Sequence, residues 1–314
     1  MDQIVAGLAR LDPTSPDAVD MVRMALKLKA CSGYVVAAAA KAVETHGLRD
    51  AIPELVAAFD ALYAAKRDPG CTGRLAIVIA LHALDHWAAD VFERGLTLVQ
   101  LEGDPNNRFD FGAAVRGACA QAHVHLLRAD CLDVCAEMLA DRWVPARIGA
   151  ARGLGESGRI DATATLRFKL ALGPDDSEVM AACFDGLFGL RRDPAISFCI
   201  AMLQHEDARA EAAALALGSQ RVAEATEALI AWCGRATKDS RHRIGYLALA
   251  LLRSDAANAE LATVIRTGPA EDALAAAEAL ATFKHEPAVH DLLIACAGDT
   301  KDMQLRVELE RLAN

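Results

Sequence analysis

Apolar residues recur along this chain in short stretches with helical spacing. One kind of stretch is dense in Ala and Gly, as in residues 149–155 and 212–218. The stretch that follows carries larger apolar residues three or four positions apart, such as Leu166 and Leu170. This alternation predicts pairs of amphipathic helices. Small residues on the first helix let two helices approach closely, and large ones on the second fill the space between pairs.

The helix pairs recur at a nearly constant interval. Leu154, Leu187, Leu217, Leu249 and Leu280 occupy the same place in successive units, with spacings of 33, 30, 32 and 31 residues. Self-similarity at a period of 20–50 residues is the sequence signature of a helical array. We therefore expect these five leucines to be buried between two layers of helices.

The period divides residues 32–302 into eight units, preceded by an N-terminal cap at 1–30 and followed by a final capping helix at 303–314. The units are 32–72, 73–112, 113–143, 144–176, 177–207, 208–240, 241–271 and 272–302. Caps with a polar outer face are what the open ends of an array need. A basic and then an acidic residue mark the turn inside each unit, as in Arg159-Ile-Asp161, and the acid is expected at the start of the second helix, where it satisfies free N–H groups.

The pattern resembles HEAT-like repeats of the kind named after phycobilisome lyases. Residues 144–165 carry the resemblance most clearly, and residues 210–229 and 273–293 follow closely. The resemblance implies an all-α fold, a right-handed α-solenoid of about eight helical hairpins that runs as one domain through residues 1–314. It does not imply one function, because such repeats occur in enzymes, glycosylases and scaffolds.

Composition narrows the functional classes. The 314 residues are 54% hydrophobic, which excludes intrinsic disorder, and carry a net charge of −10, which disfavours a nucleic acid or an anionic membrane as partner. Nine cysteines in a long chain without a secretory signal predict reduced thiols in the cytoplasm. The longest apolar stretches, such as residues 75–84, are shorter than the roughly 20 residues of a membrane span.

One cluster of residues has the spacing of a metal site. Cys119 and His123 lie one helical turn apart, as do Cys131 and Cys135, and both pairs fall in one predicted hairpin. Four such ligands can bind zinc tetrahedrally. The alternative is that all four are core residues, because the repeat places His123 where other units have leucine. We expect no metal and no cofactor.

Three catalytic or binding patterns are absent or incomplete. His82 and His86 lack the glutamate of the H-E-x-x-H zinc motif. The steps His205-Glu206 and His285-Glu286 do not stand at equivalent positions, unlike the paired His-Glu steps of HEAT-repeat deoxyhypusine hydroxylases. Aromatic residues make up only 5% of the chain, which disfavours handling of extruded bases, although a local basic strip occurs at Arg235, Lys238, Arg241, His242 and Arg243.

Two connections between units are longer than the rest, at residues 64–73 and 101–112. Both run from a second helix to the next first helix, so they should emerge on the same edge of the array, one repeat apart. Loops on a rigid scaffold are where recognition residues collect. The candidate partner-binding residues on this edge are Lys66, Arg67, Asp104, Asn106, Asn107, Arg108 and Phe109. The alternatives are neutral variation of surface loops and a partner site on the concave face.

These observations favour a non-enzymatic scaffold or adaptor that binds another protein along its concave or loop-bearing surface. The alternative is a ligand-handling or enzyme-like member of the repeat class, similar to a bilin lyase or a DNA glycosylase. The sequence contains no motif that identifies the partner.

Overall fold

The computed structural model of this chain describes residues 2–12, 14–15, 17–27, 32–65, 67–235 and 239–314. Within these residues the structure contains nineteen α-helices, three short 3₁₀ turns and one pair of two-residue strands, so the predicted all-α class is confirmed. The chain divides into two compact units, unit 1 (Met1–Thr165) and unit 2 (Leu166–Asn314). That the repeats form one continuous domain stays a prediction.

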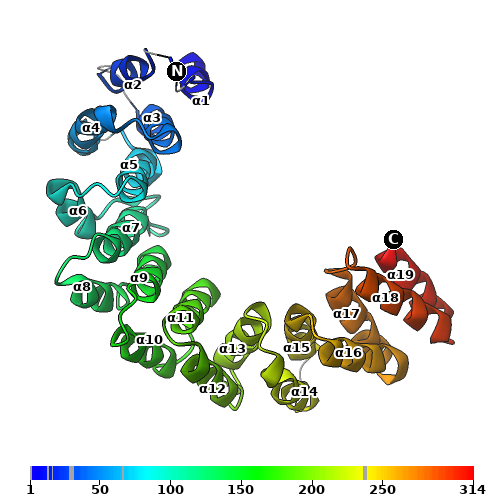
Figure 1. The fold of residues 1–314 in the computed structure, drawn as a ribbon. Coiled ribbons are helices and arrows are strands. Elements are labelled where there is room, and N and C mark those ends of the chain that lie inside the picture. Colours follow the sequence, from blue (N-terminus) through cyan, green and yellow to red (C-terminus); the bar gives the residue numbers. More distant parts are fainter. Residues whose placement is uncertain (1, 13, 16, 28–31, 66, 236–238) are drawn as a thin grey trace. The chain divides into compact units, whose positions relative to one another are not determined.

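Unit 1 contains four successive helix pairs, then one more helix and the first residues of the next (Figure 1). Its helices are α1 (Asp2–Ala9), α2 (Ala18–Lys27), α3 (Gly33–His46), α4 (Ile52–Ala65), α5 (Thr72–Ala83), α6 (Ala89–Leu96), α7 (Gly112–His125), α8 (Cys131–Met138) and α9 (Val144–Glu156). The strands β1 (Leu101–Glu102) and β2 (Phe109–Asp110) pair antiparallel between α6 and α7. Helix α10 (Ala162–Ala171) contains the boundary between the units.

Unit 2 consists of helices joined by short turns. They are α11 (Ser177–Leu190), α12 (Arg192–Met202), α13 (Ala208–Ser219), α14 (Thr226–Gly234), α15 (Asp239–Leu252), α16 (Asp255–Thr267), α17 (Ala270–Ala281), α18 (Pro287–Asp299) and α19 (Met303–Ala313). Short 3₁₀ turns precede α4, α5 and α14. Each of the eight repeats expected from the sequence therefore contains one helix pair, from α3 and α4 in the first to α17 and α18 in the last.

The helices of each unit form two layers. In unit 1 the first helices α3, α5, α7 and α9 pack on one another in order, and in unit 2 α11, α13, α15 and α17 do the same. The second helices pack on these rows; α8, for example, lies against α7 and α9, and α16 against α15 and α17. Small residues make this closeness possible. A Cβ atom on Gly149 of α9 would lie 2.3 Å from the backbone of Gly117 in α7.

The leucine series has the predicted burial. Leu154, Leu187, Leu217, Leu249 and Leu280 are between 0% and 2% exposed. Each contributes on the order of 1.5–3 kcal/mol to folding as a buried side chain. The predicted burial of these five residues is confirmed, and the register of the repeat stays a prediction.

The turn acids lie at the starts of the second helices, as predicted: Asp130 is the N-cap residue of α8, and Asp193 and Asp255 lie in the first turns of α12 and α16. Asp161 forms an ion pair with Arg159 at 2.7 Å, and Asp130 makes no side-chain cap to α8. Aspartate caps occur instead before the first helices, where Asp176 and Asp207 accept from backbone N–H groups of α11 and α13. The Asp161 carboxylate also accepts from the backbone N–H of Ala162 at the start of α10, and its contacts with Arg159 and Ala162 lower its pKa.

Candidate functional site

The two long connections lie next to each other in unit 1. The backbone N–H of Gly70 donates to Oε1 of Glu102 at 2.9 Å, and Nε2 of Gln100 donates to the carbonyl oxygen of Asp68 at 2.7 Å. Gln100 also donates to Glu102. The two segments predicted to share an edge are therefore joined directly. We call this region, comprising residues 67–73 and 98–112, the hairpin edge.

A buried ion pair fixes the first connection. Asp68 and Arg74 are each 2% exposed, and Nε of Arg74 lies 3.0 Å from Oδ2 of Asp68. The same carboxylate accepts from the backbone N–H groups of Gly73 and Arg74 at the start of α5. Arg74 also donates to Oε1 of Gln100, which carries the contact across to the second connection. A charge-assisted, multiply bonded pair of this kind holds the loop in one conformation.

A second buried ion pair fixes the other connection and extends to the next helix pair. Nη1 of Arg116 donates to Oδ2 of Asp110 at 2.8 Å, and the guanidinium contacts both carboxylate oxygens of Asp141 at 2.9 and 3.1 Å. Asp110 Oδ1 accepts from the backbone of Gln100 and Gly112. Arg116 therefore bridges the hairpin and the connection that leads into α9.

These charged residues were not among the sequence-based candidates, although a simple signal identifies them. In three successive repeats of unit 1, an aspartate in the connection is followed six residues later by an arginine on the first helix of the repeat. The pairs are Asp68 and Arg74, Asp110 and Arg116, and Asp141 and Arg147. Arg147 donates to the backbone carbonyls of Asp141 and Arg142. The recurrence is hidden by the unequal loop lengths, which disturb the period at the connections that carry the charges. We call this series the aspartate–arginine ladder.

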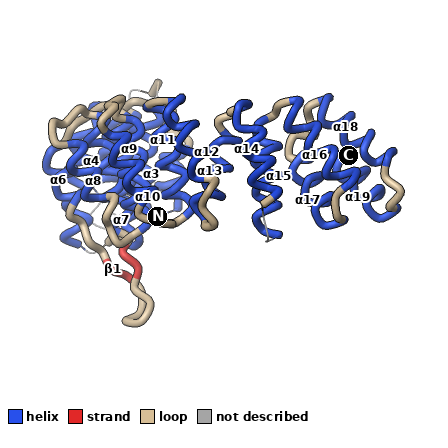
Figure 2. The backbone as a smooth tube through the Cα atoms, turned by 90° about the horizontal axis from the view of Figure 1, so that it is seen from below, coloured by secondary structure: helices blue, strands red, loops and turns tan. Residues whose placement is uncertain are grey.

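The second connection forms a β-hairpin that extends beyond the helix ends of unit 1 (Figure 2). Glu102 pairs with Phe109 and Leu101 with Asp110. At its tip, Oδ1 of Asp104 accepts from the backbone N–H groups of Asn106 and Asn107. Asp104 thereby forms the turn, as expected for an aspartate before proline. Gly103 has φ +109°, a conformation that favours glycine.

The predicted partner-binding residues divide between this tip and the loop beside it. Asp104, Asn106, Asn107, Arg108 and Phe109 lie on the hairpin and are exposed. Arg67 is exposed at the start of the first connection, and its carbonyl accepts from Gly33 at 2.9 Å. Lys66 lies outside the described residues. That these residues bind a partner stays a prediction.

Phe109 has a structural contact that the sequence did not suggest. Its ring meets Phe111 and Trp143 edge-on, with centroids 5.1 and 4.9 Å apart, and the side chain is 41% exposed. Arg142 lies over the Trp143 ring. The aromatic group attaches the base of the hairpin to the start of α9, and part of the Phe109 ring still faces solvent. Val99 and Leu101 are also exposed near this base.

The four residues with metal-like spacing lie in the core of unit 1. Cys119, Cys131, Cys135 and His123 are buried. Cys135 contacts the carbonyl of Ala120, His123 packs edge-on against Trp87, and Nε2 of His123 lies 3.7 Å from Asp130. Burial raises the pKa of Cys119 and raises that of Cys135 to about 12. No group of three or more potential ligands in the described part of the chain gathers around a common point.

The basic strip of unit 2 is matched by neighbouring acceptors. His242 pairs with Asp272 at 2.9 Å, Arg243 with Glu278 at 3.3 Å, and Arg241 donates to the carbonyl of Glu206. Arg235 donates to the carbonyl of Leu203. Lys238 lies outside the described residues. The strip therefore offers few uncommitted cations for a phosphate backbone.

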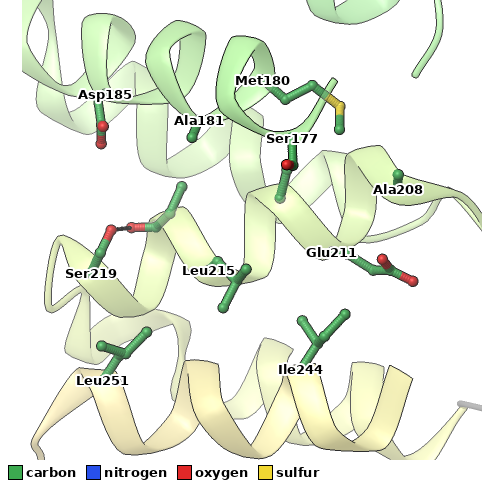
Figure 3. A pocket seen from close by; sticks show the side chains of 12 residues that line it. Ser177, Met180, Ala181, Asp185, Ala208, Glu211, Leu215, Ser219, Ile244 and Leu251 are labelled. Atoms are coloured by element: carbon green, nitrogen blue, oxygen red, sulfur yellow. Dashed lines mark hydrogen bonds between the residues drawn. The ribbon is translucent and has the colours of Figure 1, made fainter. Parts of the chain in front are cut away.

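An apolar groove lies on the row of first helices in unit 2 (Figure 3). It has a volume of about 440 Å³, and its walls come from α11, α13 and α15. Leu215 of α13 lies between Ile244 and Leu251 on one side and Met180 on the other. Two carboxylates, Asp185 and Glu211, also line it. Sequence reasoning did not identify this groove, because its residues read as ordinary positions of alanine-rich helices.

Comparison with known proteins adds no identification. Neither a scan against protein-family models nor a search of curated proteins finds a match for this chain. Among the described residues, no helix combines the length and the apolar character that crossing a membrane requires.

Proposed function

We propose that this chain is a non-enzymatic interaction scaffold, a right-handed solenoid of HEAT-like helix pairs, whose partner protein binds at the hairpin edge of unit 1. Support for the solenoid comes from the eight helix pairs, the near-constant spacing of the buried leucines and the packing of each first helix on the next. An array of this kind presents long surfaces and extra loops to a partner.

The observation that carries the proposal is the anchoring of a projecting hairpin by buried charges. Asp68, Arg74, Asp110 and Arg116 are almost fully buried, and all four serve the two long connections. Taking a charged group out of water costs several kcal/mol per ion, which the pairing must offset. The hairpin tip itself buries almost no apolar side chain. A costly anchor beneath an exposed tip is typical of a loop held ready for recognition.

Rigidity of the tip matters for affinity. Ordering a mobile loop on binding costs about 0.5–1.5 kcal/mol per immobilised side chain, and a loop that is already ordered avoids part of that cost. The exposed tip offers amide, carboxylate and guanidinium groups, and the base offers the apolar surfaces of Val99, Leu101 and Phe109. This mixture fits a protein surface, where interfaces combine an apolar centre with a polar rim.

Site-specific crosslinking tests the proposal. A photoreactive phenylalanine analogue is introduced at Asn106, and a matched control carries it at Glu224, an exposed position of unit 2. We expect the Asn106 variant to crosslink a specific protein in native lysate and the Glu224 variant to leave that protein unlabelled. Equal labelling from both positions would contradict the proposal.

Affinity for the crosslinked partner is then measured with a shortened hairpin. Residues 103–108 are replaced by Asn-Gly, a two-residue turn that preserves the pairing of Glu102 with Phe109. Phe109 is retained because its ring contacts Phe111 and Trp143. We expect the melting temperature to stay nearly unchanged and the Kd to rise at least tenfold, about 1.4 kcal/mol. An unchanged Kd would move the site away from the hairpin.

A further inference from the structure

One face of the first-helix row in unit 2 is left without a packing partner. On α13, the residues Ala208, Glu211, Ala212, Leu215 and Ser219 recur at helical spacing and line the groove. The buried residues of the same helix, such as Ala213 and Leu217, lie on its other side. The groove is open to solvent, since Ser177, Ala181, Asp185 and Ser219 on its walls are exposed. The apolar residues on its floor therefore form a stripe along α13 that no other element of the described residues covers.

The dimensions of the groove suit a helix. The lining on α13 extends over eleven residue steps, from Ala208 to Ser219, or about 16 Å along the helix axis. That length matches about three turns of a helix lying along α13. Alanines at 181, 208 and 212 leave room for the approach of another backbone, and Leu215, Ile244 and Leu251 supply ridges for its side chains.

The charges on the groove select the sign of its occupant. Its lining contains two carboxylates, Asp185 and Glu211, and no lysine, arginine or histidine. Asp185 accepts a hydrogen bond from Gln220 at 3.3 Å. Glu211 is half-buried and has no hydrogen bond or ion pair among the described residues. A half-buried carboxylate in an apolar groove is best complemented by a cation that arrives with the ligand.

Two neighbouring cations of unit 2, Arg209 and Arg243, do not meet this need. Arg209, two residues from Glu211, is held by Asp207 at 2.7 Å. Arg243, on the next first helix, pairs with Glu278. Each of these side chains already has a carboxylate partner, so Glu211 remains available in the groove.

We infer that the groove of α11, α13 and α15 binds a basic amphipathic helix of a partner protein. Its apolar residues, at i, i+3 or i+4, and i+7, pack on Leu215, Ile244 and Leu251, and a lysine or arginine of the same helix lies opposite Glu211. The site is on unit 2 and uses no residue of the hairpin edge. It is therefore a second interaction surface that does not rest on the function proposed above.

A peptide selection tests this inference without a known partner. A random library of 16-residue peptides is selected on the immobilised full-length chain and counter-selected on Ala212→Trp, in which an indole fills the groove. The control for bulk is Ala201→Trp, at an exposed position of α12 outside the groove. Circular dichroism verifies that each variant is folded. The recovered peptides are labelled, and their Kd values are measured by fluorescence anisotropy.

We expect the recovered peptides to have an apolar helical stripe with at least one lysine or arginine. Ala212→Trp and Glu211→Lys should each raise the Kd at least tenfold, and Ala201→Trp and Glu224→Lys should leave it unchanged. A peptide whose lysine is exchanged for glutamate should regain affinity for Glu211→Lys.

Three results would overturn the inference. The first is a selection that yields no peptide sensitive to Ala212→Trp, and the second is recovery of acidic or uncharged peptides. The third is loss of peptide binding in the chain whose hairpin is shortened by the Asn-Gly replacement. Because that chain should bind the peptide normally, failure of the groove and failure of the hairpin site give different results.

Discussion

Units 1 and 2 both have a buried residue at the leucine position of each repeat, such as Leu154 in unit 1 and Leu187 in unit 2. They differ in the residue that stands seven positions before it. In unit 1 this position holds an arginine three times, at 74, 116 and 147. In unit 2 the corresponding residues are Met180, Ala210, His242 and Ala273. Five of the six buried polar or charged residues in the described chain belong to unit 1, and only Thr226 belongs to unit 2.

The difference teaches that one helix-pair plan can be stabilised in two ways. In unit 2 small apolar residues bring the first helices together and leave the face of the row open as a groove. In unit 1 the ladder adds directional bonds between the first helices and the connections before them. Buried charges tolerate only an arrangement that pairs them, whereas alanines and leucines tolerate small shifts. We therefore expect unit 1 to hold a loop in place and unit 2 to offer an open helix face.

The largest expected effect comes from giving unit 1 a residue of unit 2. Arg116→Met introduces the side chain found at Met180, and it leaves the buried Asp110 carboxylate and the half-buried Asp141 carboxylate without their cation. We expect a loss of about 3–5 kcal/mol, the usual cost of removing one partner from a buried pair. Hydrogen exchange of the amides in α7 and α9 measures this loss locally.

A double variant separates charge from packing. Asp110→Asn combined with Arg116→Met removes one of the two carboxylates that the single variant leaves without a cation. The double variant should therefore recover part of the lost free energy of unfolding. Met180→Leu in unit 2 provides the matched control, with an expected change below about 1.5 kcal/mol for a volume-conserving exchange. If Arg116→Met cost no more than Met180→Leu, the ladder would have no special role in unit 1.

The leucine series should respond alike in both units. Leu154→Ala in unit 1 and Leu217→Ala in unit 2 each remove a fully buried side chain. We expect each to cost about 2–5 kcal/mol, because a cavity adds to the lost transfer energy. Hydrogen exchange of the surrounding helices gives both values. A cost below 1 kcal/mol at either site would show that the two leucines are not equivalent.

A smaller effect concerns the histidine that replaces leucine in the series. Burial lowers the pKa of His123 below its ordinary value of 6.5, and its Nδ1 has no hydrogen-bond partner. As the pH falls through 6.5, the unfolded chain therefore takes up a proton that the folded chain does not, and unit 1 loses stability. His123→Leu should stabilise unit 1 by about 1 kcal/mol at pH 8, since an unsatisfied buried group is removed.

The gain from His123→Leu should increase between pH 7 and pH 5.5, and denaturant unfolding at both values measures it. His285→Leu, at an exposed turn of unit 2, is the control and should change stability at neither pH. A gain that does not depend on pH would assign the effect to packing alone.

The sequence predicted the helix pairs, their boundaries and the buried leucines, because all three follow from local periodicity and apolar burial. It also predicted that residues 64–73 and 101–112 emerge on the same edge, one repeat apart, but not that they are joined by hydrogen bonds. It did not predict that the second connection contains strands, since two residues per strand leave no alternating pattern. The ladder was missed because an aspartate and an arginine read as surface residues until the loops that bury them are in place. The groove is formed by three helices that lie about 30 residues apart in the sequence. A local sequence pattern does not show that helices so far apart contribute to one face.

The ladder also affects how long the hairpin edge stays closed before it opens. Helix pairs that touch mainly their neighbours can form early, because little chain must be closed to bring them together. We expect the ladder's charges to lose their water only after α5, α7 and the two connections have closed around them, and their pairing to follow the rate-limiting step of folding. Contacts made that late slow unfolding and leave the rate of folding nearly unchanged. The hairpin edge is thus expected to open rarely, with a lifetime set by the return of water to four buried charges.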